Sequence, residues 1–141
     1  MSWFPVPMSG VLVMAILATS GSSANVPSTC QITLDIFSGR PNPHWTLSAA
    51  ECSVLLKQLE ALPAAGDVSP SDPPGLGYRG VIVDAPGKGP LRLFGGVVTD
   101  AADGSPRHLD RGRTVELSIV RASKGHISKE LTEAAIAAAG G

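Results

Sequence analysis

The stretch that decides the fold is Ser38-Gly-Arg-Pro-Asn-Pro-His-Trp45, because it joins the clearest strand pattern of the chain to the clearest helix pattern. Pro41 and Pro43 each fix φ and disfavour helical geometry in the residue before them. Residues 40–43 are therefore predicted to run as a stiff, polyproline-like arm. Gly39 can take the positive φ that a turn into such an arm requires.

Regular patterns flank this arm on both sides. Residues 29–37 alternate between apolar and polar side chains, which is typical of a half-buried strand. After the arm, Ser48 and Glu51 have the spacing of a capping box, and the helix that they open is predicted to end near Leu62, before Pro63. The apolar positions of this helix share one face: Cys52, Leu55, Leu56, Leu59 and Leu62.

Cys30 and Cys52 are the two cysteines of the chain, and each lies on the apolar face of its element. A disulfide between them is predicted, which would close a loop of about 20 residues and stabilise the fold by ~3 kcal/mol. The alternative is a pair of reactive or metal-binding thiols, for which a CxxC motif or a clustered histidine is expected.

The middle of the chain begins with a Pro/Gly-rich loop at residues 64–77. Strand character resumes over residues 78–83 and 91–99, and these two strands are predicted to pair antiparallel. Gly95-Gly96 is interpreted as a bulge in the second of them or as a place where another backbone segment approaches closely. Residues 100–107 are predicted to be a polar loop.

Residues 110–124 are ambiguous, because their apolar residues alternate as in a strand while Asp110 and Gly125 are typical of helix ends. The balance slightly favours a helix. A second, alanine-rich helix is predicted over residues 127–139. The element order indicates an α+β fold, in which a small, mostly antiparallel sheet carries two or three helices on one face.

Residues 1–24 have the features of a signal peptide, with no charged side chain and an apolar run at residues 11–18. Small residues, Ser22 and Ala24, stand where a signal peptidase cleaves. The mature chain would then be a single domain at residues 25–141, secreted or periplasmic, without a stable membrane anchor because the run is too short to span a bilayer. The run lacks a preceding Lys or Arg, so a misassigned start ahead of a cytosolic domain is the alternative.

Charge and histidine placement limit the function classes. A formal net charge of -1 and the lack of a basic run argue against nucleic-acid binding. His44, His108 and His126 lie far apart without the spacing of a zinc site, so no metal and no cofactor is predicted. Residues 75–80 fit GxGxxG, but no strand precedes them and no helix follows, as a dinucleotide site requires.

Two motifs, SGRPNPHW at residues 38–45 and LGYRG at residues 76–80, resemble a pattern shared by small uncharacterised proteins of the domain-of-unknown-function type. No activity is established for that group, so the resemblance implies none here. It implies that the two segments meet in space.

If the two segments meet, their donors, aromatic faces and positive charges form a candidate site for a small molecule, a glycan or a peptide. The site consists of Arg40, Asn42, His44, Trp45, Tyr78 and Arg79. Trp45 is alternatively a core residue that covers the helix start. Arg40 is alternatively paired with Asp35 or Glu51, or bonded to backbone carbonyls of residues 76–80.

The sequence therefore predicts an exported binding or interaction domain, and the lack of a nucleophile signature argues against an enzyme without deciding the question. One alternative is an inhibitor that presents residues 64–77 to a partner enzyme. Another is a small hydrolase using His44 or His108, since Asp110 is placed to orient the second of these as a base. The oligomeric state is not indicated.

Overall fold

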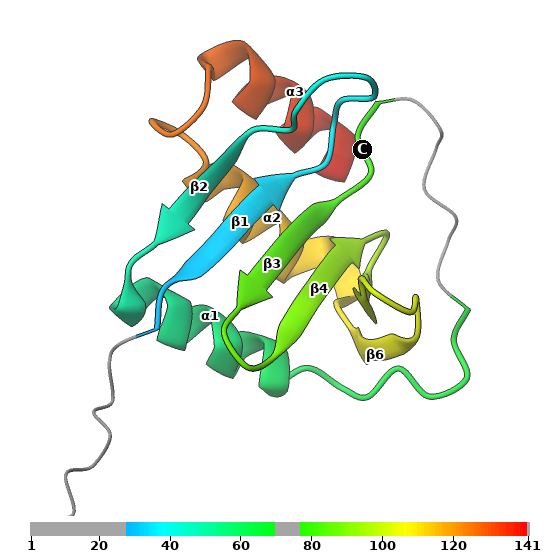
Figure 1. The fold of residues 1–141 in the computed structure, drawn as a ribbon. Coiled ribbons are helices and arrows are strands. Elements are labelled where there is room, and N and C mark those ends of the chain that lie inside the picture. The colour runs from blue at the N-terminus through cyan, green and yellow to red at the C-terminus, as the bar shows by residue number, and fades with distance from the viewer. Residues whose placement is uncertain (1–27, 70–76, 141) are drawn as a thin grey trace, which may run out of the picture.

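The computed structural model describes residues 28–69 and 77–140 (Figure 1). The predicted signal peptide at residues 1–24 lies outside the described residues, as do residues 70–76 of the Pro/Gly-rich loop on which the inhibitor hypothesis depends. In the described part of the chain, no helix is long and apolar enough to cross a membrane.

The fold is α+β, as predicted, with one six-stranded antiparallel sheet and three helices on one side of it (Figure 1). The strand order is β2-β1-β3-β4-β5-β6. The elements are β1 (Cys30–Leu34), β2 (His44–Leu47), α1 (Ala49–Glu60), β3 (Val81–Ala85), β4 (Gly89–Phe94), β5 (Val97–Asp100), β6 (Pro106–Leu109), the 3-10 turn η1 (Arg111–Arg113), α2 (Thr114–Ala122) and α3 (Lys129–Gly140).

The core lies between the sheet and the helices, and the alternation of β1 shows which face is buried. Ile32 and Leu34 are fully buried, whereas Gln31 between Cys30 and Ile32 is exposed on the opposite face. On the helix side, Ala135 and Ala139 of α3 are fully buried, because their small side chains let that helix pack closely. The opposite face of the sheet carries the polar residues of the strands.

Cys30 of β1 and Cys52 of α1 form the predicted disulfide, with their Cα atoms 5.3 Å apart. The bond joins the first strand to the first helix across the core. Both thiols are consumed in it, so the alternative of a reactive or metal-binding cysteine pair does not apply to this structure.

The predicted direct connection from strand to helix is wrong, because β2 lies between them. β1 ends at Leu34 rather than at residue 37, and the chain returns antiparallel with Trp45 opposite Ile32. The arm is thus the second half of the loop of a β-hairpin, residues 35–43. His44 and Trp45, expected on the arm, belong to the returning strand.

The predicted single strand at residues 91–99 is two strands. Gly95 and Gly96 form the turn between β4 and β5, not a bulge, and their φ values are 64° and 84°. Positive φ at both central residues is the geometry of a type I′ hairpin turn, which glycine adopts without steric cost. The alternative of a close backbone approach is confirmed at Gly96, where a Cβ would lie 3.2 Å from the backbone oxygen of Asp110. Part of the predicted loop at residues 100–107 is also a strand, β6, which pairs with β5.

The helix favoured for residues 110–124 is confirmed as α2. Asp110 caps it across the η1 turn, because its carboxylate accepts hydrogen bonds from the amides of Val115 at 3.1 Å and Glu116 at 3.0 Å. Ser48 caps α1 as predicted, with the Glu51 amide donating to Ser48 Oγ at 3.2 Å, and the Glu51 carboxylate accepts from the Ser48 hydroxyl at 3.1 Å rather than from its backbone amide.

Gly80 provides a test of the packing between β3 and β4. Its φ is +108°, and a Cβ built on it would lie 2.5 Å from the backbone oxygen of Leu93. We predict that Gly80→Ala lowers the free energy of unfolding by about 3 kcal/mol, because the backbone conformation and the clash both strain the folded state. Urea unfolding measures the loss.

Gly87→Ala is the matched control, since Gly87 also has a positive φ of +77° but a Cβ there would meet nothing within 4 Å. The control variant should lose only about 1 kcal/mol. Equal losses at Gly80 and Gly87 would mean that the close approach to Leu93 does not matter.

Candidate functional site

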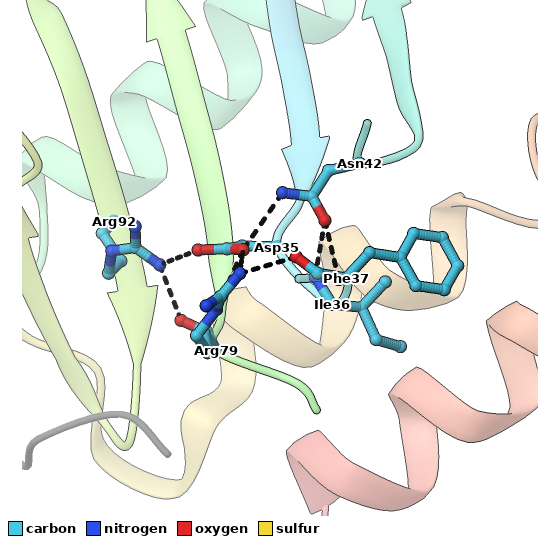
Figure 2. Close-up of polar contacts among 6 residues, drawn as sticks. All are labelled: Asp35, Ile36, Phe37, Asn42, Arg79 and Arg92. Carbon is cyan, nitrogen blue, oxygen red and sulfur yellow. Dashed lines mark hydrogen bonds and ion pairs between the residues drawn. The ribbon is translucent and has the colours of Figure 1, made fainter. Parts of the chain in front are cut away.

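Asp35 lies where the arm meets the turn before β3 (Figure 2). Its side chain is 10% exposed and accepts hydrogen bonds from two guanidinium groups, Arg79 Nη2 to Oδ1 at 2.7 Å and Arg92 Nη1 to Oδ2 at 2.7 Å. The amide group of Asn42 donates to Oδ1 at 3.1 Å. One carboxylate therefore joins the arm, the turn and β4.

Asn42 fixes the shape of the arm with both ends of its side-chain amide. While its nitrogen binds Asp35, its Oδ1 accepts from the backbone amides of Ile36 at 3.0 Å and Phe37 at 2.8 Å (Figure 2). For residues 36 and 37, these bonds replace the sheet pairing predicted up to residue 37. An asparagine suits this position because it offers an acceptor and donors together.

Backbone contacts complete the junction between the two segments. Asp35 N donates to Gly80 O at 3.0 Å, and Arg79 N donates to Asp35 O at 2.7 Å. Arg79 Nη2 donates further to Phe37 O at 2.7 Å, and Arg92 Nη1 to Arg79 O at 2.8 Å. Asp35 and Phe37, just before the first motif, are thus in direct contact with Arg79 and Gly80 of the second motif. The arm reaches the second motif through the hydrogen bond from Asn42 to Asp35.

The charges at this junction do not balance. Burial alone would raise the pKa of Asp35, but hydrogen bonds and positive charge from Arg92 and Arg79 outweigh it and hold the pKa below its ordinary value. One negative charge therefore faces two positive ones. Both arginine side chains are about a quarter exposed, at 26% and 25%, so the surplus positive charge reaches solvent.

Unused donors remain on these arginines. Among the described residues, Arg92 Nε and Nη2 have no acceptor, and all bonds of Arg79 go to Asp35 and Phe37. Arg40 is exposed, with its guanidinium carbon 3.6 Å from the centre of the Phe37 ring. Phe37 thus contacts Arg40 through its ring and Arg79 through its backbone oxygen. The pairing of Arg40 with Asp35 or Glu51, an alternative from sequence, is not formed.

The two aromatic residues of the predicted site turn away from this junction. Trp45 is 5% exposed on the helix side of β2, and its ring stacks on His126 with centroids 5.9 Å apart. Tyr78 is 8% exposed and packs against Phe94 at 6.2 Å. Of the six predicted residues, the structure brings Asn42 and Arg79 together at one carboxylate.

Arg40 and His44 lie on the surface on either side of Asn42. His44 is exposed, with Nδ1 3.5 Å from the backbone oxygen of Asn42. The sequence analysis missed Asp35 and Arg92 as site residues. Asp35 had one signal, its position directly before the arm, but Arg92 had none, because only the strand register places it beside Ile82 of β3.

For His108, one of the two residues named in the hydrolase hypothesis, the expected pairing with Asp110 does not form. His108 Nδ1 lies 3.1 Å from the backbone oxygen of Leu62, and both oxygens of Asp110 are taken by the amides that begin α2. Asp110 therefore does not orient His108. Within residues 28–69 and 77–140, no three histidine, cysteine or acidic side chains gather as a metal site would need.

A second pair of polar groups is buried beside α2, namely the Tyr78 hydroxyl and the Glu116 carboxylate. Glu116 is 1% exposed, and neither its carboxylate oxygens nor the Tyr78 hydroxyl makes a hydrogen bond within ordinary limits to a described residue. Burial raises the pKa of Glu116 to about 7, although the positive charge of Arg113 works against this. Burial and the Glu116 carboxyl also raise the pKa of Tyr78.

The chain matches no protein-family model, no curated protein and no solved structure.

Asp35→Asn tests whether charge holds the junction together. The folded state lowers the pKa of Asp35, so its stabilisation is fully present above the unfolded value of about 3.9 and is lost as pH falls through the folded value. We predict that the free energy of unfolding of the variant at pH 7 is about 2 kcal/mol lower than that of the native chain. The deficit should shrink below about pH 4.

Asp84→Asn is the control for this variant, since Asp84 is an exposed residue of β3 with no ion pair to a described residue. It should leave stability nearly unchanged at every pH. A deficit of Asp35→Asn that stays constant from acid to neutral pH would contradict the electrostatic account.

Glu116→Gln tests the buried carboxyl. Because the folded pKa of Glu116 lies near 7, above the unfolded value of about 4.3, its favourable contribution is present at acid pH and is lost as pH rises through about 7. The neutral glutamine has no such loss. As pH rises from about 4 to about 8, the free energy of unfolding of Glu116→Gln should therefore increase by roughly 3 kcal/mol relative to that of the native chain. Chemical unfolding over this range measures the change.

Glu133→Gln, at an exposed site on α3, is the control and should show no such trend. If the native chain and Glu116→Gln keep a constant difference over the whole range, Glu116 is already ionised in the fold.

Proposed function

We propose that the chain is an exported binding domain that holds an anionic, carboxylate-bearing ligand where the arm meets residues 77–80. The observation that carries the proposal is the sharing of Asp35 by two arginines. That sharing leaves positive charge and unused donors at the surface. A small molecule, a glycan or a peptide with a carboxylate fits these donors.

The guanidinium group suits this role because its planar donors match both oxygens of a carboxylate. Arg92 offers Nε and Nη2, which have no acceptor among the described residues. Asp35 and the Arg79 carbonyl already fix the position of that side chain, so a ligand would not have to order it. Arg40, stacked on Phe37, adds a third positive group on an exposed loop.

The disulfide between Cys30 and Cys52 supports the export part of the proposal, because such bonds persist in oxidising compartments. The features of residues 1–24 point in the same direction. Export would place the arginine junction in contact with ligands outside the cytosol.

The test is a titration followed by NMR of the arginine Nε–H groups, with acids and their neutral counterparts as probes. The probes are trigalacturonate and its methyl ester, and a tetrapeptide with a free C-terminus and its amide. We expect an acid to shift the signals of Arg79 and Arg92, more weakly as salt is added, while its neutral counterpart does not. The proposal fails if no acid shifts them, or if acid and neutral forms act alike.

Arg40→Ala should weaken binding of the acid about tenfold without a change in melting temperature, since Arg40 is exposed and makes no ion pair with a described residue. Arg111→Ala is the matched control, because Arg111 is an exposed arginine on η1 whose side chain makes no hydrogen bond to Asp35 or Arg79. Unchanged affinity in Arg40→Ala would remove Arg40 from the site.

A further inference from the structure

The two edge strands of the sheet, β2 and β6, differ in whether another segment of the chain pairs with them. At the β6 edge, residues 63–65 run alongside the strand: Ala65 N donates to Arg107 O at 3.1 Å, and Leu109 N donates to Pro63 O at 2.8 Å. That edge is covered by the chain itself. The β2 edge has no such cover among the described residues (Figure 1). Natural sheets usually protect an edge, so an open one marks a place where another strand can pair.

The register of the β-hairpin shows which backbone groups are open. Leu34 N donates to Pro43 O at 2.9 Å, so this is a hydrogen-bonded pair. In an antiparallel ladder such pairs recur at every second residue, which directs the backbone groups of Trp45 toward β1. The N–H and C=O groups of His44 and Thr46 therefore point outward.

Neither His44 nor Thr46 makes a backbone hydrogen bond to another described residue through these groups, and both residues are exposed. The edge thus offers two donors and two acceptors in the spacing of a strand. An added strand would lie about 4.8 Å from β2.

An apolar groove of about 350 Å³ adjoins this edge on the helix side. Trp45 and Leu47 of β2 line it together with side chains of α1 and α2, among them Val54 and Ile119. Val54 is 57% exposed, which is unusual for a large apolar side chain in this fold. The groove therefore presents apolar surface beside unpaired backbone.

An added strand would use both features at once. Alternate side chains of a strand point to opposite faces, so every second residue would enter the groove beside Trp45 and Leu47. Glu51 is the charged residue that lines this groove, which favours a lysine or arginine in the occupant over an acidic residue.

A second copy of the chain fits this surface less well. If two β2 edges paired, the helix-side residues of each strand would still be the Trp45 and Leu47 that already pack beneath their own sheet. Neither groove would receive a side chain. A segment without its own helix layer can fill the groove.

We propose that the β2 edge and the adjoining groove bind an extended segment of a partner protein as a seventh strand. The segment has apolar side chains at alternate positions and a basic residue near Glu51. This surface is separate from the arginine junction and does not depend on it.

The test uses the full mature chain and an array of heptapeptides with threonine at odd positions and valine, leucine, phenylalanine, lysine or aspartate at even positions. Trp45 lies in the groove, so its fluorescence reports occupancy. We expect peptides with apolar and basic even positions to bind, and peptides with aspartate at these positions to bind at least tenfold more weakly. Amide exchange at Thr46 should slow in the complex.

Val54→Glu should abolish this binding while leaving the fold intact, since Val54 is exposed. Val68→Glu is the matched control, because Val68 is the other exposed large apolar residue, 40% exposed, and does not line this groove. An N-methyl group on the peptide amide that faces β2 should also prevent binding.

The proposal is overturned if no peptide of the array binds, or if Val54→Glu and Val68→Glu bind alike. It is also overturned if the slow exchange at Thr46 appears only with rising protein concentration and no peptide, since β2 would then pair with a second copy.

Discussion

A single carboxylate shared by two guanidinium groups holds one end of this sheet together. A buried charge is tolerated only when it is paired and hydrogen-bonded, and Asp35 meets that condition with donors from three separate parts of the chain. The arm, the turn before β3 and strand β4 must therefore keep their relative positions. The same sharing leaves the surplus positive charge on which the proposed ligand site depends.

Both ends of β1 are fixed, by different physical means. A covalent bond joins Cys30, at its start, to α1, and the ion pairs of Asp35 follow directly after its end. In the hairpin of β1 and β2, strand β1 is thus fixed to the rest of the fold at both of its ends. One side of this hairpin presents the arginine junction, and its free edge presents unpaired backbone beside an apolar groove.

Signals contained within a few residues were readable from sequence, whereas those set by long-range register were not. The strand alternation, the Ser48 cap and the pairing of Cys30 with Cys52 are local or follow from two local patterns. Strand β2 is only four residues long and follows a proline, so it gave no periodicity to detect. In the site, Asn42 was identified by its place on the arm. Arg92 reaches Asp35 only through strand pairing.

Hydrogen exchange at residues 36 and 37 tests the central claim most directly, namely that the Asp35 and Asn42 contacts fix the residues that follow β1 to the sheet. The amides of Ile36 and Phe37 lie beyond the end of β1 but donate to Asn42 Oδ1. The account predicts that they exchange about as slowly as amides inside β1, while those of residues 38–40 exchange quickly. Unprotected exchange at Ile36 and Phe37 would show that these residues are not held by Asn42 and would contradict the account.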